Sequence, residues 1–282
     1  MSDDTAGCLY IIGTPIGNLE DATPRSKRLL AEVDIIAAED TRTAKHLLDH
    51  FEIERPTILS YFEGNEAGRT PQLLEAMAGG QTVGLISEAG MPSVSDPGQR
   101  LVEAAGAAGI VVVPVPGPSA VISAVVGSGL PTDRFTFIGF LPRESGPRRR
   151  ALGELRTRPE TLIFYESPER VGACLRDMAD AFGDGRPAVL ARELTKMYEE
   201  FVRGSCASLA EIYATKAPRG ECTLVVGGAS EVDDIPLDIE AAVRDLLAEG
   251  LGPKDVASRL MVKTGKPRRE LYQLALSLQR QR

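Results

Sequence analysis

The chain is 282 residues long, with 43% hydrophobic and 26% charged residues and a formal net charge of −8. This composition is typical of a folded, enzyme-sized globular protein and excludes a disordered chain. Four widely spaced cysteines without a C-x-x-C pair argue against a zinc knuckle and a disulfide framework. The acidic start has no apolar region and the most apolar stretch is crossed by prolines, so we expect a cytoplasmic protein with no membrane span.

The first half of the chain alternates strand-like and helix-like segments, the pattern of an α/β domain with a parallel sheet. Apolar, β-branched runs predict strands at 8–12, 34–38, 57–61, 83–86 and 110–113. Helical spacing of apolar residues predicts helices at 24–33, 41–51, 71–78, 99–108 and 119–127. Thr23 and Pro24 fit an N-cap and a first-turn proline.

A strand at 135–140, followed by an arginine-rich segment, indicates a crossing to a second α/β domain. This domain has expected strands at 161–165, 188–192, 198–203 and 222–227, and expected helices at 168–182 and 205–216. After a linker at 233–236, helices at 237–249, 253–263 and 266–278 resemble a helix-turn-helix unit. We therefore expect three parts, at 1–140, 141–230 and 231–282.

Two loops rich in proline and glycine, 86–98 and 114–120, directly follow predicted strands. Open α/β sheets bind ligands at the carboxyl ends of their strands. Proline pre-sets φ and glycine permits close backbone approach, so these loops are expected to form rigid walls that contact a ligand through main-chain groups. They predict a site for a nucleotide-like cofactor.

Several other candidates also have a plain structural explanation. His46 and His50 are four residues apart on a predicted helix, but no third ligand accompanies them, so no metal site is expected. The turn at 13–18 lacks the full G-x-G-x-x-G spacing and fits an ordinary strand-to-helix turn as well. Glu39 and Asp40, at a strand end, fit a ribose-binding acid, a catalytic base or a helix-capping pair.

Basic residues are concentrated in two segments of an otherwise acidic chain. Six arginines stand against two glutamates at 143–158, and eight basic residues stand against two acidic ones at 254–282. Such segregation is typical of patches that attract a polyanion, although solvated helix faces would give the same pattern.

Six motifs, in order along the chain, resemble the tetrapyrrole methylase superfamily. They occupy 13–19, 38–42, 87–98, 116–120, 165–168 and 192–196. The resemblance implies two α/β domains of the tetrapyrrole methylase type, with S-adenosylmethionine in a cleft between them. It also implies a homodimer and, from the last helices, a C-terminal helix-turn-helix-like extension.

Within the superfamily, the chain is most similar to members that 2′-O-methylate a cytidine at the decoding site of 16S rRNA, which makes the small ribosomal subunit the implied partner. The residues that match cofactor-binding positions are Pro15, Ile16, Gly17, Glu88, Ala89, Gly90, Val94, Ser119, Ala120, Leu194, Gly220 and Thr223. Two positions depart from the pattern, because Glu88 replaces the usual aspartate and Glu169 the usual histidine.

A ribose hydroxyl is weakly acidic, so methyl transfer to it should be assisted by a base. The candidates are Glu39, Asp40, Glu166 and Lys196, and the acids at strand ends are preferred because a lysine would need a depressed pKa. The expected RNA contacts are Arg42, Arg148, Arg149, Arg150, Lys266, Arg268 and Arg269. Two alternatives stay open: a methyltransferase for a small, precorrin-like tetrapyrrole, and a non-catalytic RNA-binding assembly factor.

Overall fold

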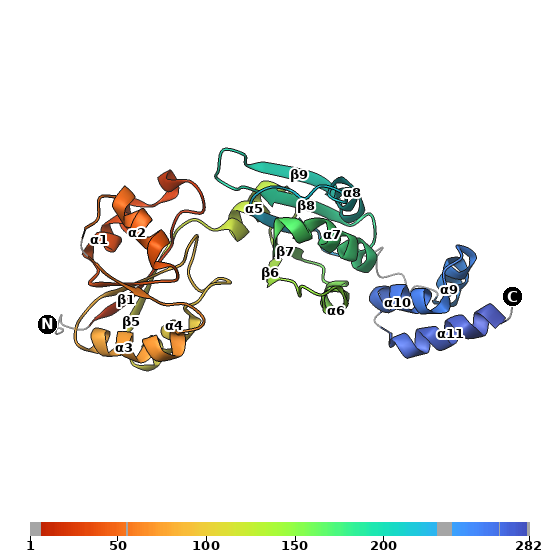
Figure 1. The fold of residues 1–282 in the computed structure, drawn as a ribbon, viewed down its shortest axis with the longest axis horizontal. Coiled ribbons are helices and arrows are strands. Elements are labelled where there is room, and N and C mark those ends of the chain that lie inside the picture. The colour runs from red at the N-terminus through yellow and green to blue at the C-terminus, as the bar shows by residue number, and fades with distance from the viewer. Residues whose placement is uncertain (1–6, 55, 230–238, 265, 281–282) are drawn as a thin grey trace. The chain divides into compact units, whose positions relative to one another are not determined.

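A computed structural model describes residues 7–54, 56–229, 239–264 and 266–280, without the side chains of 262, 263 and 280. The chain forms two compact units, Met1–Ser123 and Ala124–Arg282, each built around its own β-sheet (Figure 1). Helix α5 (Ala120–Ser128) carries the chain from the first unit into the second. The two α/β sheets and the terminal helices confirm the expected fold class.

The first unit contains a five-stranded parallel sheet in the order β3-β2-β4-β1-β5. Its strands are β1 (Cys8–Ile12), β2 (Ile35–Ala38), β3 (Thr57–Ser60), β4 (Val83–Ile86) and β5 (Val111–Val115). Its helices are the short η1 (Leu19–Asp21), α1 (Pro24–Glu32), α2 (Thr41–His50), α3 (Glu66–Ala78) and α4 (Gln99–Ala107).

Helices cover both faces of this sheet (Figure 1). Alternate residues of a strand point to opposite faces; thus Leu9 and Ile11 pack with Leu73 and Leu101 of α3 and α4. Ile12 packs on the other face with apolar residues of α1 and α2. Local chemistry starts these two helices, because the Thr23 hydroxyl accepts from Ser26 N at 3.0 Å and Asp40 accepts from Arg42 N at 2.7 Å.

The second unit contains a mixed sheet in the order β6-β7-β10-β8-β9, in which only β6 and β7 are parallel. Its strands are β6 (Phe135–Phe140), β7 (Thr161–Glu166), β8 (Pro187–Arg192), β9 (Glu200–Ser205) and β10 (Cys222–Val226). Its helices are α6 (Ser145–Leu155), α7 (Pro168–Phe182) and α8 (Cys206–Ile212). All three contribute to one apolar core, on the face of the sheet that carries Phe164 and Leu224.

Three helices follow in the same unit: α9 (Ile239–Ala248), α10 (Pro253–Thr264) and α11 (Arg268–Arg280). They share a core that includes Val243, Val256, Leu260 and Leu271. The predicted linker at 233–236 and the predicted helix start at 237 lie outside the described residues.

Three elements differ from the sequence-based prediction. Helix α3 begins five residues earlier than predicted and contains Pro71. Residues 67 and 71 are both exposed, so water can reach the carbonyl that loses its helical partner to the proline. The segment expected to be only a crossing includes helix α6. Helix α8 ends at Ile212, where a helix to 216 was predicted, and the residues that follow form a loop.

Candidate functional site

Four loops of the first unit leave its sheet from one edge, because all five strands are parallel. They follow β1, β2, β4 and β5 and occupy 13–18, 39–40, 87–98 and 116–119. β1 and β4 are neighbours, but the chain runs from β1 toward β2 on one side and from β4 toward β5 on the other. This edge is therefore a topological switch point, where open α/β sheets form ligand sites.

Close backbone packing holds three of these loops together. Thr14 N donates to Gly90 O at 2.9 Å, and Gly90 N donates to Thr14 O at 3.1 Å. A Cβ at Gly13 would lie 2.7 Å from the Gly117 Cα, a separation that real Cβ atoms do not adopt. The loops after β4, β1 and β5 are thus fixed to one another by main-chain contacts that only glycine allows.

The loop after β4 has an unusual backbone. Ser93 and Ser95 have φ values of 69° and 65°, in the left-handed region that disfavours residues other than glycine. Its last residue, Gly98, has a φ of 136°, and its N–H donates to the Glu66 carboxylate of α3 at 2.8 Å. Strain of this kind persists where the surroundings fix it, and it is often found at ligand sites.

The residues expected to contact a cofactor in this unit lie along the same edge. Gly17, Glu88, Ala89 and Val94 are exposed, and Ile16 and Gly90 are buried beneath them. Pro15, Ser119 and Ala120 are partly exposed. The edge therefore presents small and apolar groups with one carboxylate among them.

Three carboxylates gather where β2 and β4 end: Glu39, Glu88 and Asp96. The Glu88 N–H donates to the Glu39 carboxylate at 3.2 Å. Burial raises the pKa of Glu39, and the charges of Glu88 and Asp40 raise it further. Burial, with Glu39 and Glu88 nearby, raises the pKa of Asp96 to about 6. The sequence reasoning missed Asp96, and its signal was an acidic residue inside the loop already singled out, between Ser95 and Pro97.

The side chains of Asp40 and Arg42 bind each other. The Asp40 carboxylate caps α2 and forms an ion pair with Arg42 at 2.6 Å. The hydrogen bonds from the Arg42 side chain and N–H hold the pKa of Asp40 well below its usual range. Of the readings that the sequence left open, the structure gives Asp40 the capping role, and such a weakly basic carboxylate is a poor proton acceptor.

In the second unit, the expected site residues lie where β7 and β8 end and β10 begins. Cys222 is opposite both Glu166 and Arg192 in the antiparallel register. The segment after β8 again has a left-handed backbone, at Glu193 (φ 51°) and Thr195 (φ 65°). Thr223 and Leu194 are buried at this end of the sheet, and Gly220 is exposed in the turn before β10. The contact of one cofactor with these residues and with the first unit stays a prediction.

Lys196 bridges two carboxylates, with 3.0 Å from its Nζ to Glu193 and 3.0 Å to Glu221. Burial alone would lower the pKa of Lys196, but its hydrogen bonds to these carboxylates raise it overall. A charged lysine cannot accept a proton. The raised pKa and the two ion pairs do not favour Lys196 as a neutral base, and its role at the site stays a prediction.

Glu166 does not face an accessible site. Its side chain is fully buried and forms an ion pair with Arg170 at 3.1 Å, and it accepts from Ser167 N at 2.8 Å. Arg170 in turn donates to Leu141 O at 2.9 Å. This carboxylate links α7 to the end of β6, which is a structural role, and its burial does not favour the predicted role as the base.

Arg148 also has a structural role in place of the expected RNA contact. It is 5% exposed and forms an ion pair with Asp177 of α7 at 2.6 Å. Arg149 binds Asp177 and Asp180, each at 2.7 Å, while Arg150 is exposed.

Among the basic residues of the last helices, Lys266, Arg268 and Arg269 are all exposed. Lys266 forms an ion pair with Glu270 at 2.9 Å. In the part of the chain that the structure describes, no group of three or more His, Cys, Asp and Glu residues is arranged to hold a metal ion. Within the same residues, no helix is long and apolar enough to cross a membrane.

Two family models match the chain. The model of the tetrapyrrole (corrin/porphyrin) methylases matches residues 8–210, and the model of the RsmI C-terminal HTH domain matches residues 233–279. The second match coincides with the helices α9 to α11.

Curated relatives match nearly the whole chain. A protein of Synechocystis is 46% identical and the match covers 97% of this chain and 99% of that protein; it is named ribosomal RNA small subunit methyltransferase I. A protein of Xylella fastidiosa with the same name is 45% identical, over 95% of this chain and 98% of the relative. Among solved structures, uroporphyrin-III C-methyltransferase from Thermus thermophilus, complexed with S-adenyl homocysteine, has a TM-score of 0.54 at 20% identity, over 78% of this chain and 97% of that one, which shows the common fold.

Proposed function

Because this chain belongs to the tetrapyrrole (corrin/porphyrin) methylase family and continues into an RsmI C-terminal HTH domain, we propose that it transfers a methyl group from S-adenosylmethionine to small-subunit ribosomal RNA. The finer assignment is 2′-O-methylation of a decoding-site cytidine in 16S rRNA. The substrate is then RNA by necessity, because DNA has no 2′-hydroxyl to accept the methyl group.

The observation that carries this proposal is the extent of the match. Relatives named as ribosomal RNA methyltransferases are similar through the terminal helices, over 97% of this chain. The tetrapyrrole methyltransferase fold match covers 78% of it. The described part of the terminal helices also carries exposed cations, among them Arg268 and Arg269. A small tetrapyrrole does not need such a surface, whereas the phosphate backbone of RNA is bound through exposed cations of this kind.

The residues at the switch point fit the cofactor. S-adenosylmethionine supplies a methyl group on a positively charged sulfur. The carboxylates of Glu39, Glu88 and Asp96 favour a cation at this edge, and the fixed loops 13–18, 87–98 and 116–119 offer small side chains and main-chain groups to an adenosyl moiety. Glu88 retains the charge of the aspartate that the family resemblance predicts at its position.

For proton transfer from the ribose hydroxyl, we propose the Glu39 and Asp96 carboxylates in place of Glu166 and Lys196. Both lie at the switch-point edge, and their raised pKa makes them stronger bases than Asp40. The rigid loops contribute by positioning, which by itself can lower a barrier by about 7–11 kcal/mol.

The function is tested by transfer of a tritiated methyl group from S-adenosylmethionine to purified small subunits, naked 16S rRNA and large subunits. We expect label in a small-subunit substrate, and alkaline hydrolysis should leave a methylated dinucleotide there, because a 2′-O-methyl group blocks cleavage. Label at a base instead of the ribose would contradict the finer assignment. Transfer to a uroporphyrinogen and to none of the RNAs would establish the tetrapyrrole alternative.

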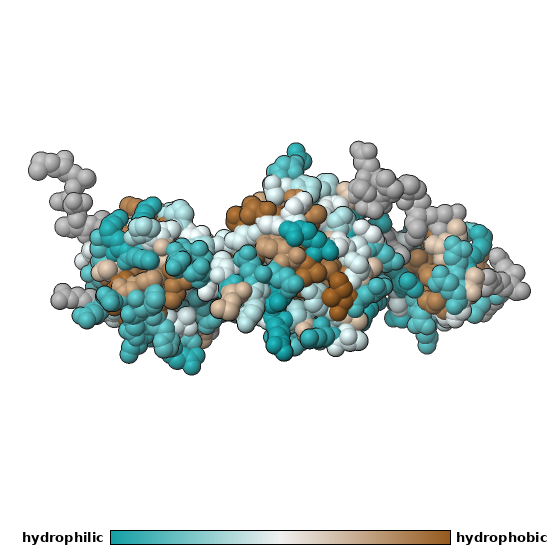
Figure 2. Space-filling view, turned by 90° about the horizontal axis from the view of Figure 1, so that it is seen from above, coloured by the Kyte–Doolittle hydropathy of each residue, from teal (hydrophilic) through white to brown (hydrophobic). Residues whose placement is uncertain are grey.

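We further propose that the enzyme is a cytoplasmic homodimer that acts on the small ribosomal subunit. Large apolar side chains are exposed on the second unit, including Met197 (89%), Val126 (65%) and Phe140 (60%), and Figure 2 shows apolar patches among its hydrophilic side chains. Such patches are typical of subunit interfaces. Light scattering should give the mass of a dimer, and Val126→Glu should shift it toward a monomer, while Val111→Glu in the first unit should not.

A further inference from the structure

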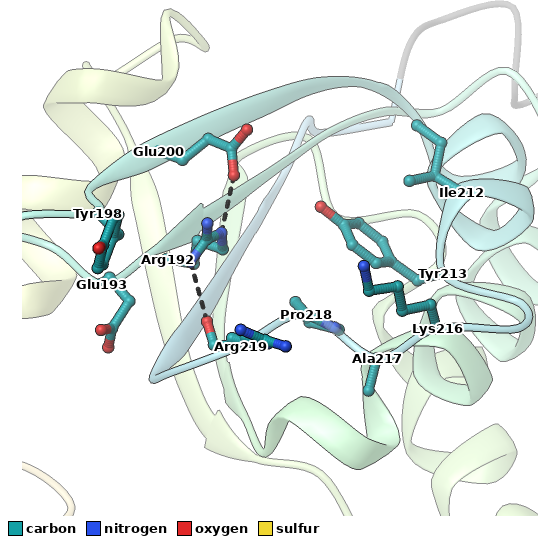
Figure 3. A pocket seen from close by; sticks show the side chains of 10 residues that line it. All are labelled: Arg192, Glu193, Tyr198, Glu200, Ile212, Tyr213, Lys216, Ala217, Pro218 and Arg219. Atoms are coloured by element: carbon teal, nitrogen blue, oxygen red, sulfur yellow. Dashed lines mark hydrogen bonds and ion pairs between the residues drawn. The ribbon is translucent and has the colours of Figure 1, made fainter.

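A pocket of about 720 Å³ opens on the second unit, and its lining residues Glu193 and Arg219 adjoin Leu194 and Gly220, two residues assigned to the cofactor (Figure 3). It lies between the β8–β9 connection and the loop that follows α8. Its lining comprises Arg192, Glu193, Tyr198, Glu200, Ile212, Tyr213, Lys216, Ala217, Pro218 and Arg219. Leu194, Gly220 and Thr223 do not line it, and its volume suits a ligand as large as a nucleotide.

The anionic groups of this pocket are already neutralised. Arg192 forms an ion pair with Glu200 at 2.7 Å, and Glu193 is held by Lys196. By contrast, Lys216 and Arg219 are exposed, and their side chains form no ion pair within the described residues. The pocket therefore has two cations to offer to an anionic ligand.

Two tyrosines supply flat surfaces to the pocket, Tyr213 on the side of Lys216 and Tyr198 on the side of Glu193 (Figure 3). Tyr198 is 69% exposed, at the mouth of the pocket. Tyr213 is partly buried, and Figure 3 shows its hydroxyl pointing into the cavity. Burial, together with the nearby Glu200 charge, raises the pKa of Tyr213, so its hydroxyl stays protonated and can donate at neutral pH.

The loop that follows α8, at 213–219, lines the pocket and is held in place by contacts with α7 and β8. Arg192 donates to Arg219 O at 3.1 Å. Gly172 of α7 has no side chain where the Tyr213 carbonyl approaches, and any Cβ there would collide with that carbonyl. Pro218 is buried against the unit. The pocket is thus preformed, which lowers the entropic cost of binding.

We propose that this pocket binds an unpaired nucleotide of the RNA substrate, with a phosphate on Lys216 and Arg219 and the base against Tyr198 and Tyr213. Cations on phosphates and aromatic rings on splayed bases are the usual means of holding single-stranded RNA. The inference rests on the proposed function, since it supplies that reaction with an RNA contact outside the cofactor edge and outside the terminal helices.

The test uses the full chain with the double variant Lys216→Ala/Arg219→Ala and, separately, Tyr198→Ala. The matched control is Arg176→Ala, which removes an exposed cation of α7 away from the pocket. We expect each pocket variant to bind S-adenosylmethionine like wild type in calorimetry, and to raise KM for the small-subunit substrate about tenfold with kcat little changed. The affinity for an unpaired oligoribonucleotide should also depend less on salt. Each lost phosphate contact should reduce the slope of log K against log salt concentration, here called the salt slope, by about 0.7.

The two hypotheses fail in different ways. If wild type methylates rRNA but the pocket variants match Arg176→Ala in KM, oligonucleotide affinity and salt slope, the pocket assignment is wrong. If wild type methylates no rRNA at all, the proposed function fails. The pocket is then judged by the oligonucleotide measurements alone, where equal affinity of wild type and variants overturns it.

Discussion

Asp40 and Asp96 both lie just beyond a strand of the same sheet, yet their surroundings move their pKa in opposite directions. Asp40 accepts hydrogen bonds from the start of α2 and from Arg42, which stabilise its charged form. Asp96 is half buried near Glu39 and Glu88, which disfavour its charged form. Environment, and not residue type, thus separates a helix cap from a candidate base.

The pKa of Asp96 predicts a pH dependence of activity. Because a base must be ionised, kcat/KM should fall as the pH is lowered through about 6. Asp96→Asn should reduce kcat/KM about 100-fold, and the remaining activity should no longer fall as the pH is lowered through about 6. Asp49→Asn, an exposed carboxylate on α2, serves as the control. An unchanged profile in Asp96→Asn would assign the proton transfer elsewhere.

The same shift predicts an effect on stability. Asp96 has a folded-state pKa of about 6 against an ordinary value of 3.8, so its ionised form is disfavoured in the native state. The free energy of unfolding should therefore decrease as the pH rises from about 4 to 6, and Asp96→Asn should be more stable above pH 6 by about 1 kcal/mol, given its partial exposure. Urea denaturation at pH 4 and pH 7 measures this difference.

Arg148 and Arg150 are two residues apart but should respond differently to substitution. Arg148→Ala leaves the buried Asp177 carboxylate with one ion-pair partner fewer. The free energy of unfolding, measured by urea denaturation, should therefore fall by about 3 kcal/mol, while S-adenosylmethionine binding is retained. Arg150→Ala removes an exposed side chain and should change stability by less than about 0.5 kcal/mol while weakening RNA binding. Equal stability of the two variants would contradict the structural role of Arg148.

At the scale of the element, the contact between Gly13 and Gly117 ties the loop after β1 to the loop after β5. Gly13→Ala places a Cβ 2.7 Å from the Gly117 Cα, so one loop must move. We expect at least a tenfold loss of affinity for S-adenosylmethionine in calorimetry, because the walls of the site are displaced. Gly106→Ala in α4 meets no atom within 4 Å and should leave affinity unchanged while stabilising its helix.

Helix α11 presents Arg268 and Arg269 in its first turn, both exposed. The double variant Arg268→Glu/Arg269→Glu should raise KM for the ribosomal substrate more than tenfold, since it replaces attraction to phosphate by repulsion. Affinity for S-adenosylmethionine should not change. Arg244→Glu on α9, outside the basic segment, is the control. Wild-type kinetics in the double variant would exclude an RNA role for this helix start.

At the scale of the whole molecule, the strands were predicted best. The run at 8–12 coincides with β1, and 83–86 and 135–140 coincide with β4 and β6, because short β-branched or aromatic runs between turn residues have few alternatives. Pro71 inside α3 was missed, since its tolerance depends on exposure that the sequence does not reveal. Helix α6 was missed because its arginines contact acids of α7 some 30 residues away in the chain.

The sequence by itself determined the α/β class, the helical end and the loops that form the candidate site, because hydrophobic periodicity and turn residues act locally. The tertiary structure decided which charged side chains remain available there. It buried Glu166 and Arg148 in ion pairs, fixed Lys196 between two carboxylates and brought Asp96 beside Glu39. Those outcomes depend on burial and on partners distant in the chain, and burial and neighbouring charge are what set the pKa of a carboxylate or an amine.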